Sequence, residues 1–185
     1  ELIKGGDTPP KILFETPYGV LVKVISFALK GKTSDVKKNI EKFVKIKSPY
    51  EILEQTTADG KALYKNYEKI NKDYDALLKA ASESATKDNV LVFVYPSDLH
   101  SFTGGLSNEL LYRFPDKLIV IAREKDGNLR VSMRSSNIVI NKILPKALEG
   151  VEGYGGGHEY ACGANIKKED FEKFIEQLKK AVKKK

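Results

Sequence analysis

Residues 117–134 read KLIVIAREKDGNLRVSMR and carry the pattern that decides the fold class. Lys117 to Ala122 is a run rich in β-branched residues, which is typical of a buried strand. The dipeptide Asp126-Gly127 favours the tight turn of a β-hairpin. We therefore expect Leu129 to Met133 to pair back across this turn, so that the segment forms two antiparallel strands.

Strands and helices alternate around this hairpin. A second apolar run, VLVFVY at residues 90–95, predicts another buried strand, and residues 164–166 predict a short edge strand. Apolar residues at helical spacing predict helices over 106–114, 138–148 and 171–182. Residues 150–157 are rich in glycine and are expected to form a loop. The predicted fold class is α/β, with a small mixed β-sheet flanked by helices.

The first half of the chain is predicted to be helical. A long linker helix is indicated by six apolar residues at heptad spacing: Leu63, Tyr67, Ile70, Tyr74, Leu77 and Ala81. Residues 18–29 are almost continuously apolar and leave strand and buried helix as open alternatives. The heptad pattern ends at 82–89. We place a domain boundary there, with a helical region at 1–87, a candidate for docking a partner, and the α/β domain at 88–185.

Composition and charge narrow the function classes. The 185 residues are 41% hydrophobic and 31% charged, which suits a folded domain rather than a disordered chain. The net charge of +7 indicates a polyanionic partner such as nucleic acid, although a Lys- and Glu-rich surface is also typical of thermophiles. The lone Cys162 cannot form an internal disulfide, which favours a cytoplasmic setting. No apolar run approaches the ~18 residues of a membrane span, so no membrane partner is expected.

One candidate site is the segment Tyr154-Gly155-Gly156-Gly157-His158. Consecutive glycines give no side-chain packing, and they suit a place where the backbone turns sharply or a ligand approaches closely. We expect a helix to begin near His158, where free amides and the helix dipole would favour a phosphate beside the imidazole. A flexible loop carrying a surface histidine is the alternative interpretation.

A second candidate site is the strand Arg130-Val131-Ser132-Met133-Arg134, followed by Ser135. Two of the four arginines of the chain lie here. On a strand, Arg130, Ser132 and Arg134 share one face, because side chains alternate. A guanidinium can bind phosphate in a bidentate manner, and serine hydroxyls can add polar contacts. The alternative is a half-exposed strand with an ordinary polar face.

Metal-binding and nucleophilic sites are not indicated. The two histidines, His100 and His158, have no neighbouring ligands at metal-binding spacing. Ser107 lacks the flanking pattern of a nucleophile elbow, and Cys162 lies among small residues as a packed side chain would. We therefore expect no metal or other cofactor in this chain.

The order of motifs nevertheless resembles a known family. A strand is followed by Gly104-Gly105-Leu106-Ser107-Asn108, then the strand at 117–122, then Ser132-Met-Arg134-Ser135, and finally Gly155-Gly-Gly-His158 with Ala161-Cys-Gly-Ala164. This order resembles the DHH-associated domain, the substrate-binding second domain of DHH phosphoesterases, over residues 88–185. The amino-acid sequences of residues 95–102 and 158–163 are most similar to those of archaeal RecJ-like, GINS-associated single-strand nucleases.

The resemblance implies a function and a set of site residues. It implies that Arg134, Ser132, Ser135 and His158 face the substrate phosphate, and that Gly155, Gly156 and Gly157 shape the same wall. In that family a separate catalytic DHH domain binds two Mn²⁺ or Mg²⁺ ions. No Asp-His-His triplet occurs in this sequence. The expected function is therefore the nucleic-acid-gripping part of a metal-dependent exonuclease, which positions single-stranded DNA or RNA and is inactive alone.

Two alternatives from other classes remain. The helical region 1–87 could be an interaction module that docks a GINS-type replication partner, as the resemblance suggests. The α/β region could instead be the second domain of an oligoribonuclease or small-nucleotide phosphodiesterase, whose glycine-histidine segment would be the same.

Overall fold

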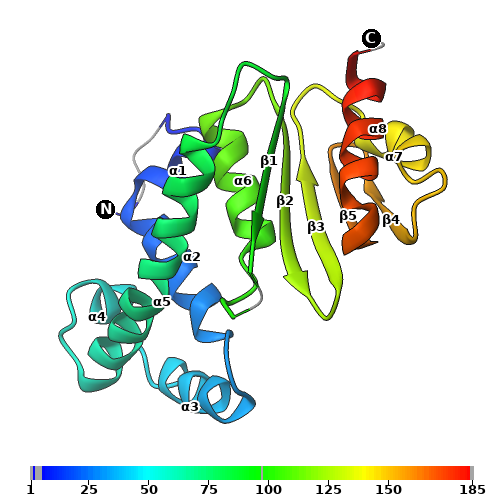
Figure 1. Cartoon of the computed structure of the whole chain (residues 1–185). Helices are drawn as coiled ribbons and strands as arrows, with labels where there is room; N and C mark the ends of the chain where they lie inside the picture. The colour runs from blue at the N-terminus through cyan, green and yellow to red at the C-terminus, as the bar shows by residue number, and fades with distance from the viewer. Residues whose placement is uncertain (1, 3–5, 97, 184–185) are drawn as a thin grey trace. The chain divides into compact units, whose positions relative to one another are not determined.

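The computed structural model describes residues 2, 6–96 and 98–183 (Figure 1). The chain forms two compact units, Glu1–Asp75 and Ala76–Lys185. The long helix α5 (Ala58–Glu83) runs through the division between them. The domain boundary expected at 87/88 lies after the end of that helix and stays a prediction.

The first unit is helical. It consists of α1 (Pro9–Glu15), α2 (Pro17–Ala28), α3 (Thr33–Phe43), α4 (Pro49–Leu53) and the beginning of α5. The apolar run at 18–29, for which the sequence left two alternatives, is therefore a helix. A capping box begins α4: Ser48 Oγ accepts from Tyr50 N, and Glu51 accepts from Ser48 N at 3.1 Å. Such a cap stabilises a short helix that has few internal hydrogen bonds.

The heptad spacing of α5 is confirmed as a buried stripe. In the first unit, Leu63 packs with Leu21, Val24 and Ile52 in a small core. Aromatic contacts extend this core, because Phe27 of α2 stacks on Tyr67 with ring centroids 6.0 Å apart. The helix is held in place mainly by this apolar burial, because isolated helices are marginal in water.

The second unit contains a five-stranded mixed sheet in the order β1-β2-β3-β5-β4. Its strands are β1 (Val90–Tyr95), β2 (Leu118–Lys125), β3 (Asn128–Arg134), β4 (Gly153–His158) and β5 (Ala161–Lys167). Strands β1 and β2 are parallel and all other neighbours are antiparallel. The expected hairpin is β2–β3, and its turn residues Asp126 and Gly127 both have positive φ, as the tight turn requires.

Helices cover the two faces of this sheet unequally. The helices are α6 (Thr103–Arg113), α7 (Ile140–Ala147) and α8 (Phe171–Lys183), with a short 3₁₀ turn at Lys168–Asp170 before α8. Figure 1 shows α7 and α8 on one side of the sheet and α6 on the other. The main core lies under α7 and α8, where Val120, Val131 and Met133 pack against Phe174 and Leu178. Helix α6 contacts β2 and β3, which leaves the corresponding face of β5 and β4 exposed.

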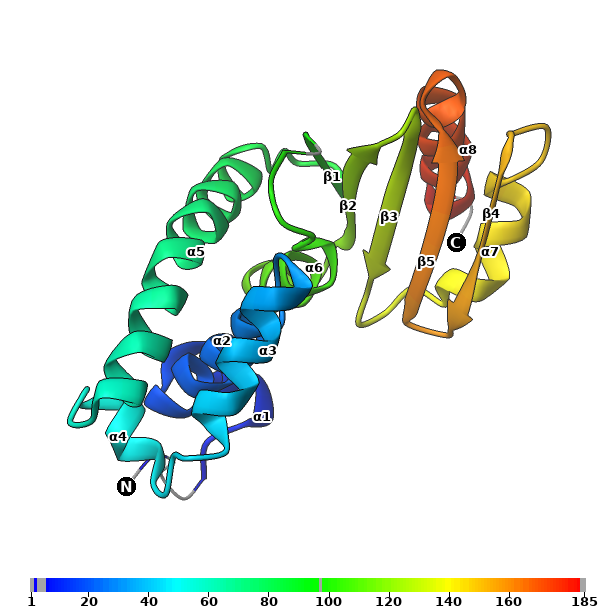
Figure 2. The same ribbon diagram turned by 90° about the horizontal axis from the view of Figure 1, so that it is seen from below.

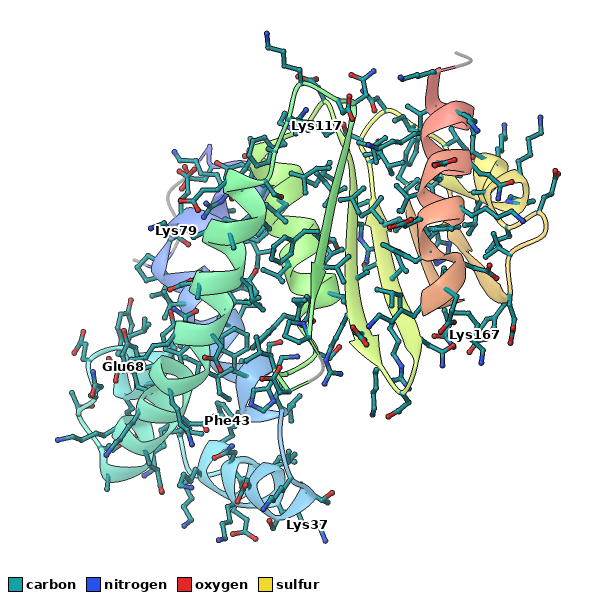
Figure 3. All side chains as sticks on the ribbon, viewed as in Figure 1. Lys37, Phe43, Glu68, Lys79, Lys117 and Lys167 are labelled. Atoms are coloured by element: carbon teal, nitrogen blue, oxygen red, sulfur yellow. The ribbon has the colours of Figure 1, made fainter. Side chains whose placement is uncertain are left out.

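Polar contacts hold the chain segments immediately before and after β1. Lys117, labelled in Figure 3, donates from Nζ to the carbonyl oxygens of Thr86 (2.7 Å) and Asp88 (2.5 Å). Lys179 of α8 donates to Asp88 Oδ2 at 3.0 Å. After β1, Tyr95 Oη accepts from Phe102 N at 2.7 Å and so holds the start of α6.

Two expectations about the glycine segment were wrong. Residues 153–158 form strand β4 and not a loop, and the chain turns directly into β5 at 159–160 rather than beginning a helix near His158. Strand β5 is also not at the edge, because it lies between β3 and β4 (Figure 2). All residues of β4 are exposed, so its sequence shows none of the apolar alternation that predicts a strand.

Candidate nucleic-acid interface

Most of the predicted site residues lie on the side of the sheet that carries α6, which covers β2 and β3 and leaves β5 and β4 exposed. We call this surface of β3, β5 and β4 the open face. Arg130, Ser132 and Arg134 lie on one face of β3, opposite the core residues Val131 and Met133. The strand register aligns these residues with β5 and β4 in three rows: Arg134–Ala161–His158, Ser132–Gly163–Gly156 and Arg130–Asn165–Tyr154. Strand β5 lies between Arg134 and His158, so their Cα atoms are about 10 Å apart at the usual spacing of strands.

The middle row contains two glycines, Gly163 and Gly156, which we call the glycine floor. A Cβ atom added at Gly156 would meet no atom within 4 Å, and one added at Gly163 would make only an ordinary contact of 3.5 Å with Val131 O. The missing side chains therefore leave open space above the sheet. The adjoining surface is hollowed by about 520 Å³ between Arg130, Tyr154 and Asn165. A ligand can approach the backbone closely at this point.

The neighbouring glycines have a different role. A Cβ at Gly155 would lie 2.8 Å from Gly163 O and 2.9 Å from Ala164 Cβ. Gly157 has φ +149°, and a Cβ there would lie 2.4 Å from Ala161 O. These two glycines allow β4 to pair closely with β5, whereas Gly156 opens the exposed face.

Arg134 is held in one orientation. Its Nε donates to Asn108 Oδ1 of α6 at 2.9 Å, and Nη1 donates to Met133 O at 2.9 Å and to Ser132 Oγ at 3.4 Å. Nη2 has no partner among the residues that the structure describes. Partial burial lowers the pKa of the Arg134 guanidinium, but an arginine stays charged at neutral pH. The side chain thus presents a fixed cation with one unused nitrogen.

Ser132 supports this arrangement from below. Its hydroxyl is buried and lies 3.0 Å from Ser107 Oγ of α6, which also donates to Gly104 O. The Ser107–Ser132 pair joins α6 to β3 beneath the guanidinium. Ser132 therefore lies at the predicted site, and its contacts are those of a residue that positions Arg134.

Ser135 is not brought to the open face. It is only 2% exposed, and its Oγ accepts from the amides of Asn137 (3.3 Å) and Ile138 (3.1 Å) while donating to Asn137 Oδ1. These contacts organise the turn that leads from β3 to α7. Its hydroxyl is engaged in the fold rather than directed toward a ligand.

His158 is exposed at the end of β4. Because no helix begins there, the free helix amides expected beside it do not exist, and His158 offers only its own imidazole to a ligand. On the other face, Cys162 Sγ lies 3.2 Å from His158 O. Burial raises the pKa of the Cys162 thiol, so this cysteine stays a packed, unreactive side chain.

Metal ligation is not supported by the residues present. Over the described ranges, no three His, Cys, Asp or Glu side chains come together as a cation site would require. The side chains around Arg134 and His158 do not fit the Mn²⁺ or Mg²⁺ implied by the family resemblance, and we derive no step through a metal. In the same ranges, no helix is both long and apolar enough to cross a membrane.

Sequence reasoning gave no individual role on this face to four residues: Asn108, Tyr154, Asn165 and Gly163. Asn108 follows Ser107 in a helix, and nothing local shows that it lies beside Arg134, 26 residues later. The other three share the face only because β4 and β5 are paired strands. The alternation of the Gly153–His158 segment would have placed Tyr154 beside Gly156 and His158, had that segment been taken as a strand.

Comparison with known proteins agrees with this architecture. Residues 101–184 match the DHHA1 domain family. RecJ from Thermus thermophilus, solved with Mn²⁺, superposes with a TM-score of 0.64 at 15% identity, over 94% of this chain and 24% of RecJ. The chain thus spans about a quarter of that protein. No curated protein sequence matches the chain.

Two further structures share the fold. The pGpG-specific phosphodiesterase PggH of Vibrio cholerae gives a TM-score of 0.60 at 15% identity, over 97% of this chain and 63% of PggH. CDC45 of Entamoeba histolytica gives 0.52 at 10% identity, over 97% of this chain and 39% of CDC45. At such identities the likeness shows the fold. The match of residues 101–184 identifies that part of the chain as a DHHA1 domain, the DHH-associated domain.

Proposed function

We propose that the open face of the DHHA1 domain binds the sugar-phosphate backbone of single-stranded DNA or RNA, as the substrate-gripping part of a RecJ-like exonuclease. The observation that carries this proposal is the row Arg134–Ala161–His158, which places a held guanidinium and an exposed imidazole beside a glycine floor. Both groups donate hydrogen bonds to phosphate oxygens, and such contacts position a strand without reading its sequence.

The geometry of Arg134 refines the expected contact. Because Nε and Nη1 already donate within the protein, Nη2 is the nitrogen that meets the ligand. A phosphate oxygen bound there receives a charge-assisted hydrogen bond, rather than the two parallel bonds expected from the sequence. Gly156 and Gly163 let the backbone of the strand approach the sheet between Arg134 and His158.

Hydrolysis is assigned to a separate catalytic DHH domain that binds Mn²⁺ or Mg²⁺. In this proposal the present chain positions the phosphodiester and is itself inactive. The lone Cys162 suits the reducing cytoplasm in which we place this function.

The test is binding of a fluorescent single-stranded oligonucleotide, measured by anisotropy over a salt series. Arg134→Ala and His158→Ala should each weaken binding, and Arg134→Ala should cost roughly 1–3 kcal/mol, the range for a hydrogen bond to a charged group. Loss of one phosphate contact should also reduce the slope of log K against log salt by about 0.7. Lys180→Ala is the matched control, because Lys180 is an exposed cation on α8, which covers the opposite face. Equal effects of Lys180→Ala and Arg134→Ala would contradict a specific phosphate site.

A small-nucleotide phosphodiesterase domain is the second candidate, favoured by the shared fold with PggH. The same face would then bind a mononucleotide or dinucleotide. Competition between a mononucleotide, a dinucleotide and a long single strand separates the two functions. The exonuclease proposal requires the long strand to compete best.

A partner-docking role for residues 1–87 is the third candidate. Helix α3 buries the polar Asn39, whose Nδ2 donates to Ala28 O at 3.0 Å, while the apolar Ile40 and the nearby Val44 stay exposed. Val44, which directly follows α3, is 82% exposed. We propose this surface for a GINS-type replication partner. Ile40→Glu with Val44→Glu should abolish capture of such a partner and leave binding of oligonucleotides unchanged.

A further inference from the structure

The third row of the open face, Arg130–Asn165–Tyr154, differs in its side chains from the row Arg134–Ala161–His158 that is proposed to bind phosphate. Tyr154 is 71% exposed, the most exposed aromatic side chain among the described residues, although it lies in a strand. Such exposure leaves its ring available to a ligand. Tyr154 lies beside Gly156 and Gly163, so the space next to the ring is open.

The two neighbours of Tyr154 in this row, Asn165 and Arg130, are polar residues that could contact a ligand. Asn165 Oδ1 is buried and has no hydrogen-bond partner within the described part of the chain. A buried acceptor without a donor is unfavourable, so this side chain gains from meeting a hydrogen-bond donor of a ligand. Arg130 is exposed on the other side of Asn165 and adds a positive charge. These three side chains line the hollow of about 520 Å³.

We infer that this row is a nucleobase subsite, in which one base of a bound strand stacks on Tyr154 and meets Asn165 at its polar edge. The inference rests on the proposed function, because the same strand contacts Arg134 and His158. An aromatic ring accepts any base, since every base has a π-face. Arg130 then faces the adjoining phosphate or stacks on the base.

The spacing of the rows defines the ligand that can use both. Four residues along the strands separate Arg134 from Arg130 and His158 from Tyr154, or about 13 Å. A B-form strand rises ~3.4 Å per nucleotide, so this distance spans about four stacked nucleotides, and fewer if the strand is stretched. A mononucleotide is too short to reach both rows. The substrate class is therefore an oligonucleotide, with an anchored phosphate and a stacked base a few nucleotides away.

The test uses the full chain and two fluorescent single strands of equal length, long enough to reach both rows, one carrying bases and one entirely abasic. The wild type should bind the base-bearing strand more tightly, by about fivefold to a hundredfold for one stacked base. Tyr154→Ala should abolish this preference, and Tyr154→Trp should keep it. Arg134→Ala should weaken both strands and leave their ratio unchanged. Tyr18→Ala, which removes an exposed tyrosine of α2, is the matched control and should change neither affinity.

The outcomes separate the subsite from the function on which it rests. If Tyr154→Ala keeps the wild-type ratio, or if the wild type binds both strands equally, the base subsite is wrong while phosphate binding at Arg134 stands. If the wild type binds neither strand, the proposed function is wrong and the subsite with it.

Discussion

Asn108 Oδ1 accepts a hydrogen bond of 2.9 Å from Arg134 Nε, which connects helix α6 to the last residue of β3. This contact and those of Nη1 leave Nη2 as the nitrogen of Arg134 without a partner among the described residues. Asn108 therefore acts through Arg134, as a positioning residue, and its contribution to binding should be separable from that of the charge.

Replacing Asn108 with Ala should weaken oligonucleotide binding by about 2- to 10-fold, the equivalent of one ordinary hydrogen bond. The salt dependence should stay as in the wild type, because no charge is lost. The double variant Asn108→Ala/Arg134→Ala should bind no more weakly than Arg134→Ala alone. An additive loss in the double variant, measured by anisotropy, would show that Asn108 touches the ligand itself.

Gly155→Ala and Gly156→Ala should change different properties: the first should lower stability and the second should weaken binding. At Gly155 a methyl group meets Ala164 Cβ and Gly163 O within 3 Å, so the free energy of unfolding should fall by about 1–3 kcal/mol. At Gly156 the methyl group enters open space, so stability should be unchanged or slightly higher. Binding of a strand should nevertheless weaken, because the methyl group rises from the floor of the face. Urea denaturation and anisotropy measure the two effects, and a stable Gly156→Ala variant with wild-type affinity would contradict close approach at the floor.

Tyr95→Phe should destabilise the second unit. The amide of Phe102 is buried and donates to Tyr95 Oη at 2.7 Å, so removal of the hydroxyl leaves that amide without its acceptor. Such a loss costs about 1–3 kcal/mol. Tyr160→Phe is the control, because it removes a hydroxyl group from a tyrosine that is 44% exposed. Equal melting temperatures for the two variants would show that the loop re-forms without the bond.

The Asp88–Lys179 pair should make stability depend on acid pH. The hydrogen bond and charge of Lys179 lower the pKa of Asp88 below its ordinary value of 3.8. Since the folded pKa is the lower one, the pair stabilises the fold above about pH 4, and this contribution is lost as the pH falls through the folded pKa. Thermal melts from near-neutral pH down to below the ordinary pKa of a carboxyl group should fall less steeply for Asp88→Asn than for the wild type. Lys179→Ala should flatten the curve in the same way, and parallel curves for all three proteins would exclude the pair.

Prediction from the sequence succeeded where the pattern of apolar residues along the chain indicates which side chains are buried. The apolar strands at 90–95 and 117–122, the Asp126-Gly127 turn and the heptad stripe of α5 were identified because each pattern is local. It failed at β4, where the residues from Gly153 to His158 bury nothing and become a strand only by pairing with β5. The helix expected at His158 was wrong for the same reason.

The candidate site divides in a similar way. The shared face of Arg130, Ser132 and Arg134 follows from strand alternation, and the register of β5 and β4 supports their grouping with His158. Ser135 directly follows that strand, yet it lies buried in a turn. Asn108 and Tyr154 needed the tertiary structure, because the pairing of distant segments, rather than spacing along the chain, brings them to the face.

Strand β4 is held by its backbone pairing with β5 and by contacts with α7, but none of its side chains is buried. Its amides should therefore exchange with solvent deuterium sooner than those of β2, through local opening of the sheet edge. A strand of nucleic acid bridging Arg134 and His158 would close that opening. If the amides of Gly155 to His158 exchange more slowly after oligonucleotide is added, the bound ligand stabilises the edge strand of the sheet.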